Sequence, residues 1–131
     1  MIQKHPILPQ LIRKVPGQFS WVDQRLVRDR LIESLSHPAA ALYLFLVTVA
    51  DSQGLSYYSD RSLMTRLSMD GHTLDAARRN LMACGLIAFR APLYQVLPLD
   101  PVAEREPASA RRSSEQVSIG DLFKQMMGGA L

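Results

Sequence analysis

Residues 60–97, DRSLMTRLSMDGHTLDAARRNLMACGLIAFRAPLYQVL, decide the fold of this chain. A short helix is expected over about 60–67, with Ser59 or Asp60 as its cap. After a tight turn, a second helix is expected over about 71–84, because its apolar residues recur at i, i+3, i+7 and i+8. The buried stripe predicted by this spacing consists of Leu74, Ala77, Leu81 and Met82.

The residues after this second helix predict a β-hairpin. Gly85 suits the helix end, because a left-handed conformation costs glycine nothing. Two strands, over about 86–90 and 93–97, then enclose a turn at 91–92. Helices followed by a small antiparallel sheet predict the α+β class, mainly helical.

The region before residue 60 supplies the rest of the expected core. Asp23 is placed to cap a helix over about 24–35, in which Leu26, Val27, Leu31 and Leu35 share one stripe. A further helix over about 37–51 is apolar nearly all round, so we expect it to be buried on most sides. Gly54 ends it, and a strand follows over about 55–58.

Composition divides the chain into four parts. Prolines and basic residues predict an extended arm over 1–17, the domain occupies 18–98, and 99–117 is a polar, turn-rich linker. Residues 118–131 have the pattern of a short amphipathic helix, with one apolar stripe made of Ile119, Leu122, Phe123, Met126 and Met127. About ten residues are too few for a stable isolated helix. Two alternatives stay open: the stripe packs on this domain or on another copy, or it docks into a protein partner.

With its two expected helices, turn and hairpin, the segment 60–97 resembles the winged helix-turn-helix domains of bacterial regulators and replication initiators. The run 81–87, LMACGLI, resembles the Leu-x-x-x-Gly-Leu-Ile passage from recognition helix to wing in that family. The other matching positions are Leu63, 67–69 and 73–74, and the resemblance extends over roughly 80 residues. It implies a winged-helix fold, double-stranded DNA as partner, and a role in transcription, replication or a mobile element.

The resemblance also implies which residues touch DNA, because the first half of a recognition helix meets base edges in the major groove. The residues expected there are His72, Thr73, Asp75, Arg78, Arg79 and Asn80. Contacts to the DNA backbone are expected from the preceding helix start, the wing tip and the arm. These residues are Ser59, Arg61, Ser62, Arg90, Lys4, Arg13 and Lys14. Two copies on paired half-sites, a homodimer, would fit such a protein.

Charge supports a polyanion partner only mildly. The net charge is +3, but residues 23–97 hold eight Lys and Arg against seven Asp and Glu. The carboxylate of Asp75 repels phosphate unless it accepts from cytosine N4. The alternative function is therefore a winged helix for protein–protein assembly, which recruits its partner through 118–131.

The sequence offers no pattern typical of an enzyme. His5, His37, His72 and Cys84 lack metal-ligand spacing, and no Gly-rich phosphate loop is present, so we expect no catalytic residue, metal or cofactor. Cys84 is expected to be a buried structural thiol.

Two further features concern the binding of single-stranded nucleic acid and the crossing of a membrane. The pairs Phe19 with Trp21 and Tyr57 with Tyr58 suit either stacking of single-stranded bases or the edge of the core, and we favour the core. The apolar run 39–47 is shorter than the ~20 residues that cross a bilayer. Without a signal-peptide pattern, the expected location is the cytoplasm, on the nucleoid when DNA is bound.

Overall fold

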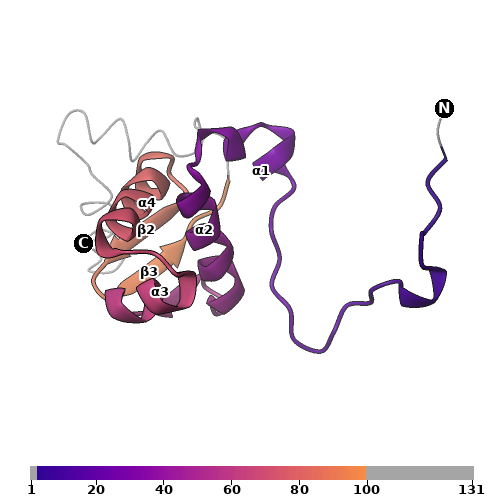
Figure 1. Cartoon of the computed structure of the whole chain (residues 1–131), viewed down its shortest axis with the longest axis horizontal. Coiled ribbons are helices and arrows are strands. Elements are labelled where there is room, and N and C mark those ends of the chain that lie inside the picture. Colours follow the sequence, from indigo (N-terminus) through magenta and orange to yellow (C-terminus); the bar gives the residue numbers. More distant parts are fainter. Residues whose placement is uncertain (1–2, 100–131) are drawn as a thin grey trace.

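The computed structural model describes residues 3–99, which form an α+β unit that is mostly helical (Figure 1). Before the sheet come two short 3-10 turns, η1 (Pro9–Leu11) and η2 (Leu31–Ser34), and the helices α1 (Arg25–Arg28) and α2 (His37–Val49). Then follow β1 (Leu55–Tyr57), α3 (Asp60–Leu67), α4 (Gly71–Ala83), β2 (Ile87–Arg90) and β3 (Leu93–Val96). The predicted helix within 118–131 and nearly all of the predicted linker lie outside the described residues.

The three strands form an antiparallel sheet in the order β1-β3-β2. Strands β2 and β3 make the predicted hairpin, in which Arg90 lies opposite Leu93. Strand β1, which precedes α3 in the chain, adds to the far edge of β3, with Tyr57 opposite the same Leu93. Helices combined with a small three-stranded antiparallel sheet are compatible with a winged-helix-like arrangement.

The core lies between α2, α4 and the sheet. Helix α2 packs against α4 and β3, and α4 also packs against α3 and β2. The largest fully buried side chains come from all of these elements: Leu42, Leu46, Leu63, Leu74, Leu81, Leu86, Ile87 and Tyr94. Burial of these side chains is the main stabilising contribution, at roughly 1.5–3 kcal/mol for each large apolar side chain.

Local signals placed α3, α4 and the hairpin correctly. The Ser59 hydroxyl caps α3 by accepting from the Ser62 backbone N–H at 3.1 Å. Asp70 was expected only as part of the turn, but its carboxylate caps α4 by accepting from the Thr73 N–H at 2.7 Å. Gly85 has φ +74°, the left-handed conformation expected of it just after α4.

The predicted continuous helix over 24–35 is wrong. Helix α1 ends at Arg28, Arg30 adopts a left-handed conformation with φ +64°, and η2 follows. This break redirects the chain, so that Leu26 is buried and Leu31 packs against the core while Val27 stays exposed. A straight helix could not place the residues before and after the bend in this way.

Burial was overestimated for α2 and for one position of α4. Leu44 is 62% exposed, and Ala41 and Thr48 in the same helix are exposed as well. The reason is that α4 and the sheet cover only one side of α2. Met82, expected in the buried stripe of α4, also lies at the surface.

Candidate nucleic-acid interface

Helices α3 and α4 form a pair joined by a tight turn. Ser68 ends α3 in a left-handed conformation, and the Met69 N–H returns to the Met64 carbonyl at 3.1 Å. The capping carboxylate of Asp70 then starts α4. These local bonds fix where α4 begins and therefore which of its residues face outward.

Helix α4 exposes one continuous stripe, which we call the α4 outer stripe: His72, Ala76, Arg79 and Ala83. These positions follow i, i+4, i+7 and i+11, so they lie along one line of the helix surface. The Arg79 side chain is 72% exposed. Because the residue between His72 and Arg79 on this line is Ala76, another molecule can approach the helix backbone closely there.

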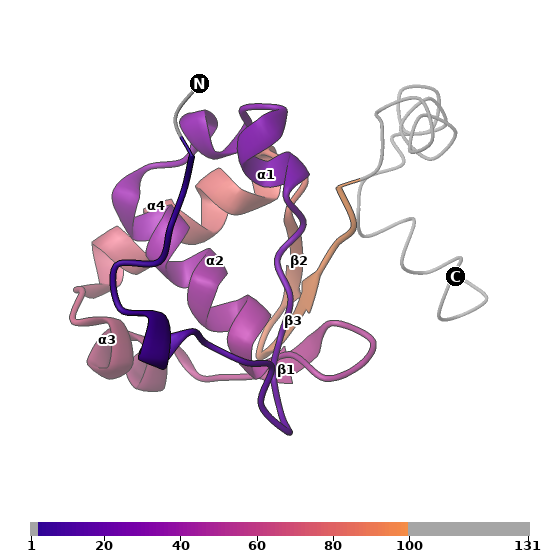
Figure 2. The same cartoon turned by 90° about the vertical axis from the view of Figure 1, so that its right-hand side faces the viewer.

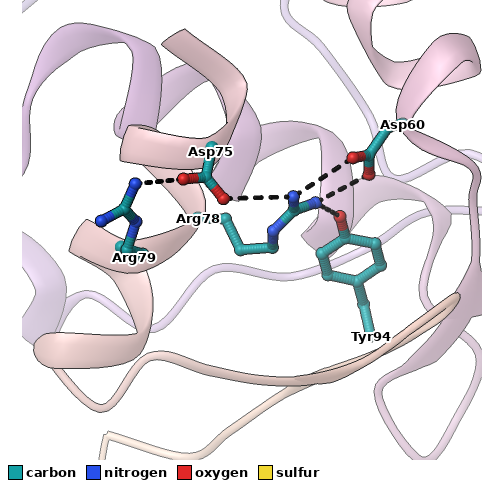
Figure 3. A network of polar contacts seen from close by, with 5 residues as sticks. All are labelled: Asp60, Asp75, Arg78, Arg79 and Tyr94. Atoms are coloured by element: carbon teal, nitrogen blue, oxygen red, sulfur yellow. Dashed lines mark hydrogen bonds and ion pairs between the residues drawn. The ribbon is translucent and has the colours of Figure 1, made fainter. Parts of the chain in front are cut away.

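Arg78 does not face outward, and the prediction that it does is wrong. Its residue exposure is 7%, and the guanidinium turns inward between α3 and β3 (Figure 3). It donates to both Asp60 carboxylate oxygens, at 2.9 and 3.3 Å, and to the Tyr94 hydroxyl at 2.6 Å. It also lies over the Phe89 ring, 4.4 Å from the centroid.

The electrostatics of this buried guanidinium follow from its partners. Burial acts to lower the pKa of Arg78, but the hydrogen bonds to Asp60 and Tyr94 outweigh it and raise the pKa above its usual value. The pKa of Tyr94 is raised in turn, because burial outweighs the hydrogen bond from Arg78. Arg78 is therefore a permanent internal cation that ties α4 to α3 and β3.

Asp75 lies between the two arginines, as Figure 3 shows. One carboxylate oxygen accepts from Arg79, and the other lies 3.6 Å from the Arg78 guanidinium. The hydrogen bond from Arg79 is the main cause that lowers the pKa of Asp75. The two cations offset the carboxylate charge, which reduces the repulsion of phosphate expected at this position.

The expectation that Asn80 faces outward is wrong as well. Its side-chain carbonyl accepts from the Ser36 backbone N–H at 2.8 Å, and its amide donates to the Ser34 carbonyl at 3.1 Å. Asn80 thus fastens the second half of α4 to the start of α2. Half-buried Cys84 lies beside it, with its Sγ 3.6 Å from the Asn80 amide nitrogen.

Other predicted contact residues lie at the surface around α4. Arg61 is exposed in the first turn of α3, and Arg90 is exposed at the end of β2, next to the hairpin turn. Sequence reasoning missed Arg66, which is exposed in the last turn of α3 and lies 6.0 Å from the Phe45 ring centroid. Its position in α3 was predicted, but not the side of the molecule that it faces.

The arm residues Lys4, Arg13 and Lys14 are exposed but do not join this group. Both views show the arm leaving the domain on the side of α2, whereas α4 lies behind α2 as seen from the arm (Figures 1 and 2). Within one copy, the arm and the α4 outer stripe therefore do not form one surface.

The aromatic pairs are mostly not part of the core. Phe19, Trp21 and Tyr57 are exposed, and only Tyr58 packs inward, edge-on to Phe45 at 5.0 Å between ring centroids. Phe19 and Trp21 line an open groove of about 550 Å³ between the end of the arm, the end of α2 and residues 96–99. Asp23, Arg25 and Asp51 also line this groove, and Arg25 pairs with Asp23 at 2.7 Å, so the lining keeps a net negative charge that disfavours a phosphate backbone there.

Over residues 3–99, no helix is long and apolar enough to cross a membrane. In the same part of the chain, His, Cys, Asp and Glu form no group of three that could hold a metal ion. Compared with known proteins, the chain matches no family model, no curated protein and no solved structure.

Proposed function

We propose that the chain is a winged-helix protein that binds double-stranded DNA by placing the α4 outer stripe in the major groove. The observation that carries the proposal is the stripe itself: an exposed helix face with Ala76 between the polar groups of His72 and Arg79. An α-helix fits the major groove, and small side chains let it enter deeply. The helix pair, its turn and the following hairpin support the same assignment.

The polar groups of the stripe suit direct contact with bases. The Arg79 guanidinium has the two parallel donors that match O6 and N7 of guanine, and the methyl group of Ala76 suits a thymine methyl. Arg79 must leave Asp75 to reach a base, but an exposed ion pair of this kind contributes little stability. Asp75, once released, is free to accept from cytosine N4.

The surrounding cations suit the phosphates on either side of the groove. Arg61 and Ser62 stand at the start of α3, where the helix dipole favours anions, and Arg90 stands beside the hairpin turn. In this arrangement Arg79 provides the preference for a DNA sequence, because it contacts bases. Arg61 and Arg90 provide affinity for any duplex, because they contact phosphates. A cytoplasmic regulator of transcription, or an accessory factor for replication or a mobile element, fits this surface.

The test is fluorescence anisotropy on a random-sequence duplex at several salt concentrations, followed by selection of the preferred site. Arg79→Ala should weaken binding to the selected site by about 5- to 100-fold, because a bidentate base contact is lost. Arg61→Ala should weaken binding to all duplexes and reduce the salt slope by about one. Arg28→Ala is the matched control, since it removes an exposed arginine from α1 rather than from α3 or α4.

The proposal fails if the wild-type chain binds no duplex at low salt, or if Arg28→Ala weakens binding as much as Arg79→Ala does. Absence of DNA binding would favour the assembly function, in which the domain holds a protein partner. Arg78→Ala is not suitable for this experiment, because removal of its internal ion pair should destabilise the domain, and weaker binding would then not report a lost DNA contact.

A further inference from the structure

Helix α2 has an open face that is unusual for a surface helix. Its sequence, HPAAALYLFLVTV, contains no Lys, Arg, Asp or Glu. The exposed residues at i, i+4, i+7 and i+11 are His37, Ala41, Leu44 and Thr48, which we call the α2 open face. A helix face that remains in water normally carries charged residues. The composition of this face therefore indicates that another surface covers it.

The arm over residues 3–17 is a second uncovered apolar surface. Its five large apolar side chains are all exposed, with Ile7 at 94%: Ile7, Leu8, Leu11, Ile12 and Val15. The following residues Phe19, Trp21 and Val22 are exposed as well. Figure 1 shows the arm standing away from the domain, and in Figure 2 it passes in front of α2. Monomeric proteins rarely leave so much contiguous apolar surface in water.

We propose that the arm of one copy lies along the α2 open face of a second copy, and that the arm of the second copy lies along the α2 open face of the first. Such an exchange is symmetric, because each copy gives one arm and receives one. Both surfaces belong to the same chain, so no other partner is needed to cover either of them. The exchange of arms is separate from DNA binding, because α4 packs against the side of α2 that faces away from the arm (Figures 1 and 2).

Charge is complementary in this arrangement. Residues 3–22 contain Lys4, Arg13 and Lys14 but no Asp or Glu, and the α2 open face offers them no like charge. Where α2 ends, the carbonyl end of the helix and exposed Asp51 attract cations. The arm can thus lay its apolar residues on α2 and place basic side chains at the helix end.

Size is also adequate. Helix α2 has 13 residues and is about 20 Å long, which the extended arm can span. With roughly 100 Å² from each of the five exposed apolar side chains of the arm, each arm buries roughly 500 Å², and the two arms with the α2 open faces that they cover exceed the roughly 1,000 Å² that a specific interface needs. The two exchanged arms together therefore reach the area that a stable dimer needs.

The test is the oligomeric state of the full chain by sedimentation velocity, without DNA. We expect a dimer for the wild type. Leu44→Glu on the α2 open face, or serine at Ile7, Leu8, Leu11 and Ile12 together, should raise the dimer dissociation constant at least ~10-fold. Ala76→Glu is the matched control, because it adds the same carboxylate to an exposed position of α4 and should leave the dimer intact. Circular dichroism checks that each variant keeps its helices.

A mixing experiment separates arm exchange from other dimers. The serine variant keeps its α2 open face, and the Leu44→Glu variant keeps its arm, so an equimolar mixture should form a mixed dimer through one intact contact. Each variant alone should stay monomeric at the same concentration. The proposal is overturned if the wild type is monomeric at about 100 μM, if either variant dimerises like the wild type, or if the mixture forms no mixed dimer.

Discussion

Replacing Arg78 by alanine should destabilise the domain far more than replacing its neighbour Arg79. The Arg78 guanidinium makes three hydrogen bonds inside the protein, two to Asp60 and one to the Tyr94 hydroxyl. Its removal leaves that hydroxyl, on a side chain with no exposed surface, without this donor. It also opens a space above the Phe89 ring, where the guanidinium now packs.

The size of the effect follows from which partners are left buried. Breaking a buried ion pair by removing one member costs about 3–5 kcal/mol. The Asp60 side chain is 57% exposed and can be hydrated once it is alone, which favours the lower end. The Tyr94 hydroxyl that loses its donor accounts for about 1–3 kcal/mol of this cost. We therefore expect Arg78→Ala to lower the free energy of unfolding by about 3–4 kcal/mol, a large share of the total for a small domain.

The assay is urea unfolding of the full chain, followed by circular dichroism. Trp21 fluorescence is a poor probe, because that side chain is already exposed in the folded state. Arg79→Ala, which removes an exposed guanidinium, should change the free energy of unfolding by less than about 0.5 kcal/mol. Adding Tyr94→Phe to Arg78→Ala should recover about 1 kcal/mol, since no hydroxyl is then abandoned. A loss below about 1 kcal/mol for Arg78→Ala, with an unchanged m-value, would refute the reasoning.

Three further predictions concern single positions. Gly54→Ala should destabilise the domain by at least about 1 kcal/mol in urea unfolding, because Gly54 has φ +84° and a Cβ there would meet the Val96 carbonyl oxygen at 2.7 Å. Asn80→Ala should cost about 1–3 kcal/mol, since two backbone groups at the start of α2 lose their partner, whereas Asn80→Asp should fall between wild type and alanine. The backbone N–H of Thr73 lowers the pKa of Asp70, so this cap stabilises the fold above about pH 4 and its contribution is lost as pH falls through the folded-state pKa. Asp70→Asn keeps a capping oxygen without a titrating group, so its unfolding free energy should fall less between about pH 5 and 2 than that of the wild type, and an identical slope would contradict this prediction.

The boundaries of α3, α4 and the hairpin were predictable because their signals act over a few residues. A hydroxyl at Ser59 and a carboxylate at Asp70 reach backbone N–H groups three positions ahead, and Gly85 adopts its left-handed conformation whatever packs around it. The bend at Arg30 carried no such signal. It depends on how Leu26 and Leu31 meet the core on either side of the bend.

The candidate interface was only partly predictable. Periodicity identified Leu74, Ala77 and Leu81 as buried, and it left the residues between them as candidates for the outer face. Helical spacing alone could not tell whether Arg78 and Asn80, at the edge of the buried stripe, turn inward or outward. The α4 outer stripe is thus narrower than expected. It keeps His72 and Arg79 but does not include Arg78 and Asn80.

The amino-acid sequence by itself determined the α+β class, the order of the elements from α2 onward and the ends of α3 and α4, because each depends on neighbours along the chain. Only the tertiary structure decided the inward turn of Arg78 and Asn80, since their partners Asp60 and Ser36 lie 18 and 44 residues away in the chain. It also decided which side of α2 stays open. Because α2 is apolar nearly all round, its sequence does not indicate which side stays exposed. That side is determined only when α4 and the sheet pack against the opposite side of the helix.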